Sequence, residues 1–216
     1  MTVLEQVLPP PVAAVERYDD EQPADLFPEE EALLGNAVPK RRFEFGTVRA
    51  CAREAMRQLD VEPAPILPGP KREPLWPAGI VGSLTHCAGY RAAALARASD
   101  FETIGIDAEP HKPAPDGVLG AIAIPAELRR MPGLKVDDPK ICWDRLLFSA
   151  KESTYKAWYP VTRRWLGFED ADITLNADGT FHSRILLADT PIAGFDGRWL
   201  VQGDLLLTVI AVPARG

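Results

Sequence analysis

The sequence lacks the features that mark several large classes of protein. It contains no run of about 18 apolar residues, so we expect no membrane span. Its first eleven residues hold Glu5 and three prolines and no basic segment, which does not fit a secretory signal. The chain has only three cysteines and no CxxC pair, so we expect neither a disulfide framework nor a zinc site. These absences together predict a cytoplasmic protein.

Common nucleotide-binding and metalloprotease motifs are also missing. No GxxxxGK[ST] loop, GxGxxG fingerprint or HExxH helix occurs. The net charge of −7 argues against broad nucleic-acid binding. A length of 216 residues fits one domain, or two small lobes packed as one unit. We detect no internal sequence repeat.

Basic residues are gathered in three places along this acidic chain. They are Lys40, Arg41, Arg42, Arg49, Arg53 and Arg57, then Lys71 and Arg72, then Lys151, Lys156, Arg163 and Arg164. Any single one of them can be solvated surface. An anionic ligand of an acidic protein nevertheless needs a local positive patch, and the clustering favours a pocket for a polyanion.

The hydrophobic pattern predicts helices mixed with antiparallel strands, an α+β fold. We expect helices from Pro28, over 40–59, over 125–131 and over 139–158, with Pro160 ending the last. We expect strands over 80–84, 90–96 and 103–107 as one group, and hairpins formed by 173–175 with 181–187 and by 199–202 with 205–212. Residues 1–24 should run irregularly along the surface, 62–79 should form a loop, and 110–120 should join two halves.

The segment Gly105-Ile106-Asp107-Ala108-Glu109 ends one of these strands with two acids. Side chains at i and i+2 of a strand point to the same face, so Asp107 and Glu109 can converge on one point. Solvent-facing alternation is the plain alternative. The apolar residues just before the pair favour a strand that enters a core.

The segment 148–158 reads as the middle of a helix, on which Glu152 and Lys156 share a face at i and i+4. The plain alternative is a surface salt bridge, worth about a few tenths of a kcal/mol. Ser149 lies one turn earlier, and aromatic residues surround the pair: Phe148, Tyr155, Trp158 and Trp165. Three acids and a lysine on rigid elements can hold a hard divalent cation and a phosphate together, which points to phosphoryl-group chemistry.

His86 directly follows the strand over 80–84. It can be a turn or core histidine, or a ligand of an anion. Its neighbour Cys87 suggests a cysteine nucleophile only weakly, because adjacent side chains rarely have the geometry for contact between base and thiol.

Three motifs, read in order, resemble a known family. GSLTHC (82–87), GIDAEPH (105–111) and FSAKESTYKAWYP (148–160) resemble the 4'-phosphopantetheinyl transferases of the surfactin/enterobactin type. WLGFEDA (165–171) is most similar to their actinobacterial members. The resemblance implies two similar lobes related by a pseudo-twofold, over residues 1–108 and 109–216, with coenzyme A in the cleft between them.

The resemblance also implies roles for single residues. Asp107, Glu109 and Glu152 would bind Mg²⁺, with Mn²⁺ as an alternative. Glu152 would be the general base, directly or through a water, and Lys156 would contact the phosphates, so that Asp107, Glu152 and Lys156 are the expected catalytic residues. The expected coenzyme A contacts are Lys156, His86 at the 3'-phosphate with Thr85 nearby, Arg41 and Arg49 at the nucleotide phosphates, and Lys71, Arg72, Glu73 and Pro74 beside the adenine and ribose. Ala108 departs from relatives that carry a polar residue there, which leaves the number of metal ions open.

The reaction so implied moves the 4'-phosphopantetheine arm from coenzyme A to a serine of an acyl or peptidyl carrier protein and releases adenosine 3',5'-bisphosphate. We expect a monomer that binds neither nucleic acid nor membrane. One alternative is a non-catalytic coenzyme A-binding protein of the same fold, and another is a metal-dependent phosphodiesterase. Siderophore, polyketide, peptide and fatty-acid pathways all stay open, and the aromatic residues can line a pantetheine tunnel or fill the core.

Overall fold

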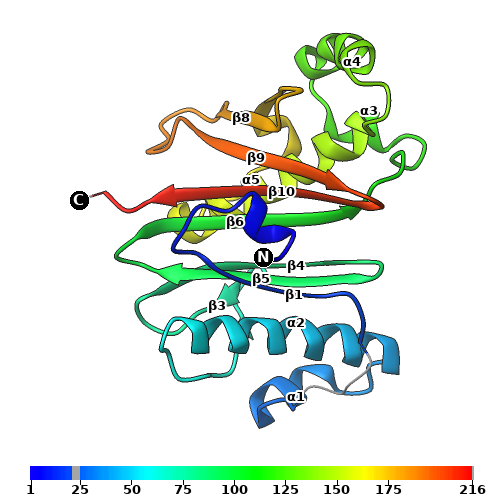
Figure 1. Cartoon of the computed structure of the whole chain (residues 1–216). Helices are drawn as coiled ribbons and strands as arrows, with labels where there is room; N and C mark the ends of the chain where they lie inside the picture. Colours follow the sequence, from blue (N-terminus) through cyan, green and yellow to red (C-terminus); the bar gives the residue numbers. More distant parts are fainter. Residues whose placement is uncertain (21–24, 216) are drawn as a thin grey trace.

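Two antiparallel sheets, each packed against one long helix, form the body of the protein (Figure 1). The computed structural model describes residues 1–20 and 25–215. The first sheet has the order β1-β5-β4 and the second the order β6-β10-β9-β8-β7. The strands are β1 (Ala13–Arg17), β4 (Ile80–Cys87), β5 (Tyr90–Arg97), β6 (Phe101–Pro110), β7 (Ala171–Leu175), β8 (Thr180–Ile185), β9 (Gly194–Gln202) and β10 (Leu205–Pro213), with β2 (Leu67–Pro68) and β3 (Pro74–Leu75) as a separate small hairpin. This mixture confirms the α+β content.

The long helices are α2 (Pro39–Gln58) on the first sheet and α5 (Trp143–Thr162) on the second. The shorter ones are η1 (Leu4–Gln6), α1 (Pro28–Leu34), α3 (Val118–Ile122), α4 (Pro125–Asp137) and η2 (Phe168–Asp170). Proline opens α1, α2 and α4, where its fixed φ suits the first turn and its missing N–H costs nothing. No helix of the described residues is both long and apolar enough to cross a membrane.

Strand β5 is buried on both faces, which explains its run of small apolar residues. Ala93 and Leu95 face α2 and pack with its Cys51 and Met56. Alanines 92, 94 and 96 face the opposite side, where they join a second cluster with residues of β6, β10 and the N-terminal segment. The small side chains let layers approach from both sides of the strand.

The N-terminal segment is more ordered than we predicted. Instead of running irregularly along the surface, it forms η1 and β1, and Leu4 is fully buried. Glu16 on β1 accepts hydrogen bonds from the N–H groups of Val3 and Leu4 and from the Tyr90 hydroxyl. A side-chain acceptor that comes from another segment gives no periodic signal in the sequence. The last residues of that predicted irregular stretch, 21–24, lie outside the described residues.

The strand predicted over 103–107 belongs to the other sheet, which corrects our grouping. β6 forms its backbone pairs with β10, in which Asp107 lies opposite Thr208. It forms no such pairs with β4 or β5 in the sheets described. β4 nevertheless lies beside β6. Ser83 Oγ accepts from the Ile106 N–H at 3.1 Å, and Thr85 Oγ1 accepts from the Ala108 N–H at 2.9 Å. We call this contact the β4–β6 seam: side-chain hydroxyls take the place of carbonyls and join the two sheets.

Helix α5 lies close against β6 because residue 105 is glycine. A Cβ at Gly105 would overlap the Ser153 carbonyl of α5. The helix begins later than we predicted, at Trp143, and it runs past Pro160 to Thr162. Pro160 falls in the last turn, where it removes one hydrogen bond only, and Arg163 ends the helix by adopting a left-handed conformation with φ 55°. α4 likewise continues past 131, through Pro132 to Asp137.

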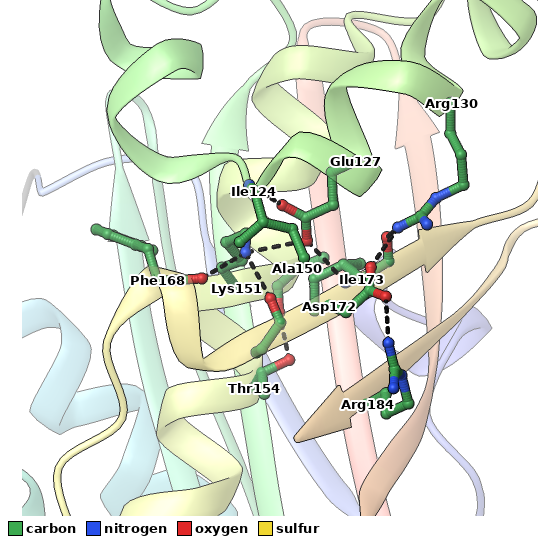
Figure 2. A network of polar contacts seen from close by, with 11 residues as sticks. Ile124, Glu127, Arg130, Ala150, Lys151, Thr154, Phe168, Asp172, Ile173 and Arg184 are labelled. Atoms are coloured by element: carbon green, nitrogen blue, oxygen red, sulfur yellow. Dashed lines mark hydrogen bonds and ion pairs between the residues drawn. The ribbon is translucent and has the colours of Figure 1, made fainter. Parts of the chain in front are cut away.

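A buried ion pair joins α4 to α5, as Figure 2 shows. Glu127, the third residue of α4, accepts from the Ile124 N–H at its own helix start and from the Ile173 N–H of β7. Lys151 of α5 lies 3.0 Å from Glu127 and also donates to the carbonyls of Phe168 and Ala171. All three N–H bonds of this ammonium are used inside the protein, so Lys151 serves the fold and not a ligand.

We predict that Lys151→Met destabilises the protein by about 3–5 kcal/mol, because Glu127 keeps its buried charge without a cation. Urea unfolding followed by circular dichroism measures the change. The control is Arg57→Ala, which breaks the exposed pair between Arg57 and Glu54 and should cost about 1 kcal/mol or less. Equal stability of the two variants would contradict a structural role for Lys151.

Candidate functional site

A cavity of about 660 Å³ is lined by residues of α2, the β2–β3 hairpin, β4 and α5. Nine of the residues predicted from the sequence line it: Arg41, Arg49, Lys71, Arg72, Glu73, Pro74, His86, Glu152 and Lys156. The remaining predicted residues, Thr85, Asp107 and Glu109, lie outside this lining. Segments far apart in the chain thus meet around one space, which the sequence pattern alone could not establish.

A polar stripe on α5 meets β6 at Asp107. Ser149 Oγ donates to Asp107 Oδ2 at 2.8 Å, and Lys156 Nζ lies 2.8 Å from Asp107 Oδ1. Lys156 also donates to the Ile106 carbonyl at 3.0 Å. The ion-pair partner of Lys156 is therefore Asp107 and not Glu152, so the alternative of a surface salt bridge along the helix is wrong.

Glu152 lines the cavity and has no hydrogen-bond or ion-pair partner within the described parts of the chain. Burial raises the pKa of its carboxyl group, the charge of Asp107 raises it further, and Lys156 opposes both effects. A partly buried carboxylate with a raised pKa and free lone pairs is a stronger base than an exposed one. Of the three acids, Glu152 has the environment best suited to accept a proton.

Glu109 is engaged by a residue that we did not predict. Arg145 of α5 donates to Glu109 Oε2 at 3.0 Å and to the Lys112 and Pro113 carbonyls. Burial and the charge of Asp107 raise the pKa of Glu109, and Arg145 lowers it. Arg145 lies four residues before Ser149 and seven before Glu152, so the helical spacing places it on the same face of α5 as these two residues. That spacing could have predicted Arg145 as a site residue.

The three acids do not form a closed metal cage. Within the described residues, 1–20 and 25–215, no group of three His, Cys, Asp or Glu side chains is placed to hold a metal ion. Carboxylates are nevertheless the oxygen ligands that Mg²⁺ prefers, and Mg²⁺ is usually bound through one or two of them together with substrate phosphates and waters. The Asp107 charge acts on both Glu109 and Glu152, so the three groups lie near one another. This donor chemistry fits a site that the substrate completes.

Ala108, which stands between two of these acids, points elsewhere. Its side chain is buried in the apolar cluster of β5, β6 and β10, because neighbouring residues of a strand face opposite sides. Its N–H group is used by Thr85 at the β4–β6 seam. The Thr85 hydroxyl is thereby engaged in the fold, next to the predicted site.

His86 and several cations form the other end of the cavity. Burial lowers the pKa of His86, Glu44 raises it, and Lys156, Arg41 and Arg91 lower it, so the imidazole is uncharged at neutral pH. Burial also lowers the pKa of Arg49 to about 10, against the effect of Glu30. Glu44 also lines the cavity, although we did not predict it as a site residue.

Not every residue of the predicted basic clusters reaches the cavity. Arg53 is buried against Glu30, and Lys151 is buried against Glu127, so these two cations are neutralised inside the fold. Arg57 forms an exposed pair with Glu54. The sequence does not show which basic residues are structural and which are available to a ligand. That difference depends on whether a buried carboxylate from another segment pairs with the residue.

The structure also resolves the alternatives for Cys87 and the aromatic residues. Burial and the charges of Glu109 and Asp107 raise the pKa of Cys87 to about 12, so its thiol stays protonated and is a poor nucleophile. Trp158 is fully buried in the core. Tyr155 lines the cavity, stacked on Tyr159 and edge-on to Trp165.

Two family models match the chain in succession. Residues 29–96 match the 4'-phosphopantetheinyl transferase N-terminal domain, and residues 103–210 match the 4'-phosphopantetheinyl transferase superfamily. Their boundary falls between β5 and β6, close to the β4–β6 seam.

Curated relatives agree over most of the chain. The sequence is 51% identical to the 4'-phosphopantetheinyl transferase PptT of Mycobacterium tuberculosis (strain ATCC 25618 / H37Rv), over 98% of each protein. It is 50% identical to the 4'-phosphopantetheinyl transferase Svp of Streptomyces mobaraensis, over 88% of this chain and 79% of that protein. It is 45% identical to the 4'-phosphopantetheinyl transferase Npt of Nocardia iowensis, over 97% of this chain and 99% of that protein. This chain therefore belongs to the 4'-phosphopantetheinyl transferase family of enzymes.

Proposed function

We propose that this enzyme transfers the 4'-phosphopantetheine arm of coenzyme A to a serine hydroxyl of an acyl or peptidyl carrier protein. The observation that carries the proposal is the cavity itself, in which Glu152 and Lys156 of α5 face Arg41, Lys71, Arg72 and His86. Coenzyme A brings about four negative charges, which such a wall can neutralise on an otherwise acidic protein. The relatives PptT, Svp and Npt are named 4'-phosphopantetheinyl transferases, which supports the transfer of this arm.

In this proposal Glu152 accepts the proton of the carrier serine as its oxygen attacks the phosphorus that bears pantetheine. A bond forms between that oxygen and the phosphorus, and the bond from the phosphorus to the bridging oxygen breaks. The products are the holo-carrier and adenosine 3',5'-bisphosphate. Two N–H bonds of the Lys156 ammonium hold Asp107 and the Ile106 carbonyl, and the third is left for the phosphate oxygens of the departing nucleotide.

Asp107, Glu109 and Glu152 are the residues that would hold Mg²⁺, or Mn²⁺ in its place. When bound, the cation would neutralise charge on the pyrophosphate. Ser149 and Arg145 support this arrangement, because they orient Asp107 and Glu109 from α5. Ser149 and Arg145 therefore act as positioning residues.

The lobe arrangement belongs to the same proposal. We propose two similar lobes with coenzyme A between them, since α2 packs on one sheet and α5 on the other. The predicted boundary between residues 108 and 109 falls inside β6, which lies wholly in the second sheet, so we place the division of the lobes between β5 and β6 instead. The non-catalytic alternative is disfavoured, because both acids of β6, Glu152 and Lys156 are all present. A monomer in the cytoplasm stays a prediction.

Mass spectrometry of a carrier protein tests the reaction. An apo-carrier incubated with the enzyme, Mg²⁺ and coenzyme A should gain the mass of one phosphopantetheine arm. Glu152→Gln should lower this rate by about a hundredfold or more while coenzyme A still binds, because the amide cannot take the serine proton. Coenzyme A binding without any mass gain by wild type would support the non-catalytic protein, free hydrolysis products would support a phosphodiesterase, and near-normal turnover by Glu152→Gln would refute the assignment of the base.

The role of His86 predicts a pH dependence with a definite sign. Its lowered pKa leaves it neutral at pH 7, and a bound 3'-phosphate would favour the charged imidazolium. The preference for coenzyme A over 3'-dephospho-coenzyme A should therefore grow as the pH falls from about 8 to about 6. Isothermal titration calorimetry at several pH values measures it. His86→Gln should flatten the dependence, and an unchanged slope in that variant would place the 3'-phosphate elsewhere.

Carrier docking should involve the exposed end of α5. Arg163 pairs with Glu73 of the cavity wall at 2.9 Å, whereas the Arg164 side chain donates to the Asp189 carbonyl. We predict that Arg164→Glu raises KM for an acidic carrier by about fivefold or more and leaves the Kd of coenzyme A unchanged, because charge complementarity acts on the partner that meets the charge. Arg163→Glu should raise both constants. Equal loss of both in Arg164→Glu would remove this surface from the docking face.

A further inference from the structure

We propose that Glu30, a buried acid on α1, is a positioning residue for the nucleotide end of the cavity. It would act through Arg49 and through the root of the β2–β3 hairpin, without touching the ligand itself. This inference rests on the proposed function, because it takes Arg49 and the hairpin as contacts of coenzyme A.

Glu30 is completely buried, and its carboxylate collects contacts from three segments. It accepts from the Phe27 N–H at the start of its own helix at 3.1 Å and from the Ile66 N–H at 2.8 Å. It pairs with Arg53 of α2 at 2.9 Å, and the Arg49 Nε lies 3.5 Å away. One carboxylate therefore fixes α1, α2 and the segment before β2 relative to one another.

The peptide groups on both sides of Ile66 are held by this network. The Ile66 N–H donates to Glu30, and the Ile66 carbonyl accepts from Arg49 Nε at 3.2 Å and from an Arg49 terminal nitrogen at 3.0 Å. The next residue, Leu67, starts β2 and lines the cavity. The hairpin that follows carries the lining residues Lys71, Arg72, Glu73 and Pro74. A displacement at Ile66 would move this whole wall.

Arg49 itself gains its orientation from the same contacts. Its guanidinium has five N–H bonds, and the contacts to Ile66 and to the Phe45 carbonyl use three of them. The guanidinium also lies over the Phe45 ring, 3.2 Å from its centre. The side chain is therefore fixed along one edge and by stacking, while it still lines the cavity and keeps donors for an anion.

The second half of the chain contains the same arrangement away from the cavity. Glu127 also follows a helix-opening proline by two residues, caps its own helix, accepts a backbone N–H from a distant segment, here the middle of β7, and pairs with a cation of the long helix (Figure 2). The segments that it holds, α4 and β7, contribute no residue to the cavity lining. Glu127 is thus a matched control: a similar structural duty without the proposed effect on the ligand.

The test measures coenzyme A binding to the full-length variants by isothermal titration calorimetry. Glu30→Gln should raise the Kd of coenzyme A by about tenfold, as expected when a charge-assisted contact is misplaced. Glu30→Asp keeps the charge but is one methylene shorter, so it should raise the Kd as well. Glu127→Gln should lower the thermal midpoint to a similar extent and change the Kd by less than about twofold. Hydrogen exchange should quicken over residues 66–75 in Glu30→Gln and not in Glu127→Gln.

Three outcomes would overturn the inference. The first is a wild-type Kd in both Glu30 variants, which would leave the proposed function intact. The second is an equal loss of affinity in Glu127→Gln, which would show a general effect of destabilisation. The third is a wild-type protein that does not bind coenzyme A, which would overturn the proposed function together with this inference. If Glu30→Gln does not fold, Glu30→Asp with hydrogen exchange over 66–75 decides the matter.

Discussion

The rest of the structure depends on the β4–β6 seam, where two side-chain hydroxyls replace the backbone hydrogen bonds of a strand pair. Ser83 and Thr85 bind the N–H groups of Ile106 and Ala108, so β4 and β6 run side by side although they belong to different sheets. Each contact gives a partner to a buried N–H group, which would cost about 1–3 kcal/mol of stability if it were left without a hydrogen bond. The seam fixes His86 on β4 relative to Asp107 on β6. It thereby sets the distance between the proposed anion-binding end and the acidic end of the site.

The N-terminal segment supports the same joint from the other side. Val3, Leu4 and Val7 pack in one cluster with residues of β5, β6 and β10, which belong to both sheets. In Figure 1 the N-terminal segment accordingly lies over the two sheets where they meet. Glu16 holds this segment by its backbone. A stretch that looks irregular in sequence therefore contributes to the rigidity of the site, because it buries apolar surface shared by both sheets.

Buried carboxylates divide the cations of the chain into two groups. Glu30 and Glu127 each engage a cation of a long helix inside the protein, whereas Lys156 and Arg145 engage the acids of β6. A buried charge has to be paired, so Arg53 and Lys151, which pair with Glu30 and Glu127, are not available to a ligand. The cavity receives the cations that are left, among them Arg41, Lys71 and Arg72.

The sequence by itself determined most of the periodic helices and strands and the chemical types of the site. Helical spacing predicted α2, turn residues predicted the last two hairpins, and the alternation at Asp107 and Glu109 placed both acids on one face of a strand. These features follow from the period of a single helix or strand. Only the tertiary structure decided that Lys156 pairs with Asp107, that Arg145 engages Glu109, that β6 joins β10, and that Lys151 and Arg53 are buried. Each of these depends on which distant segment supplies the partner, and residues on one strand or helix carry no record of that choice.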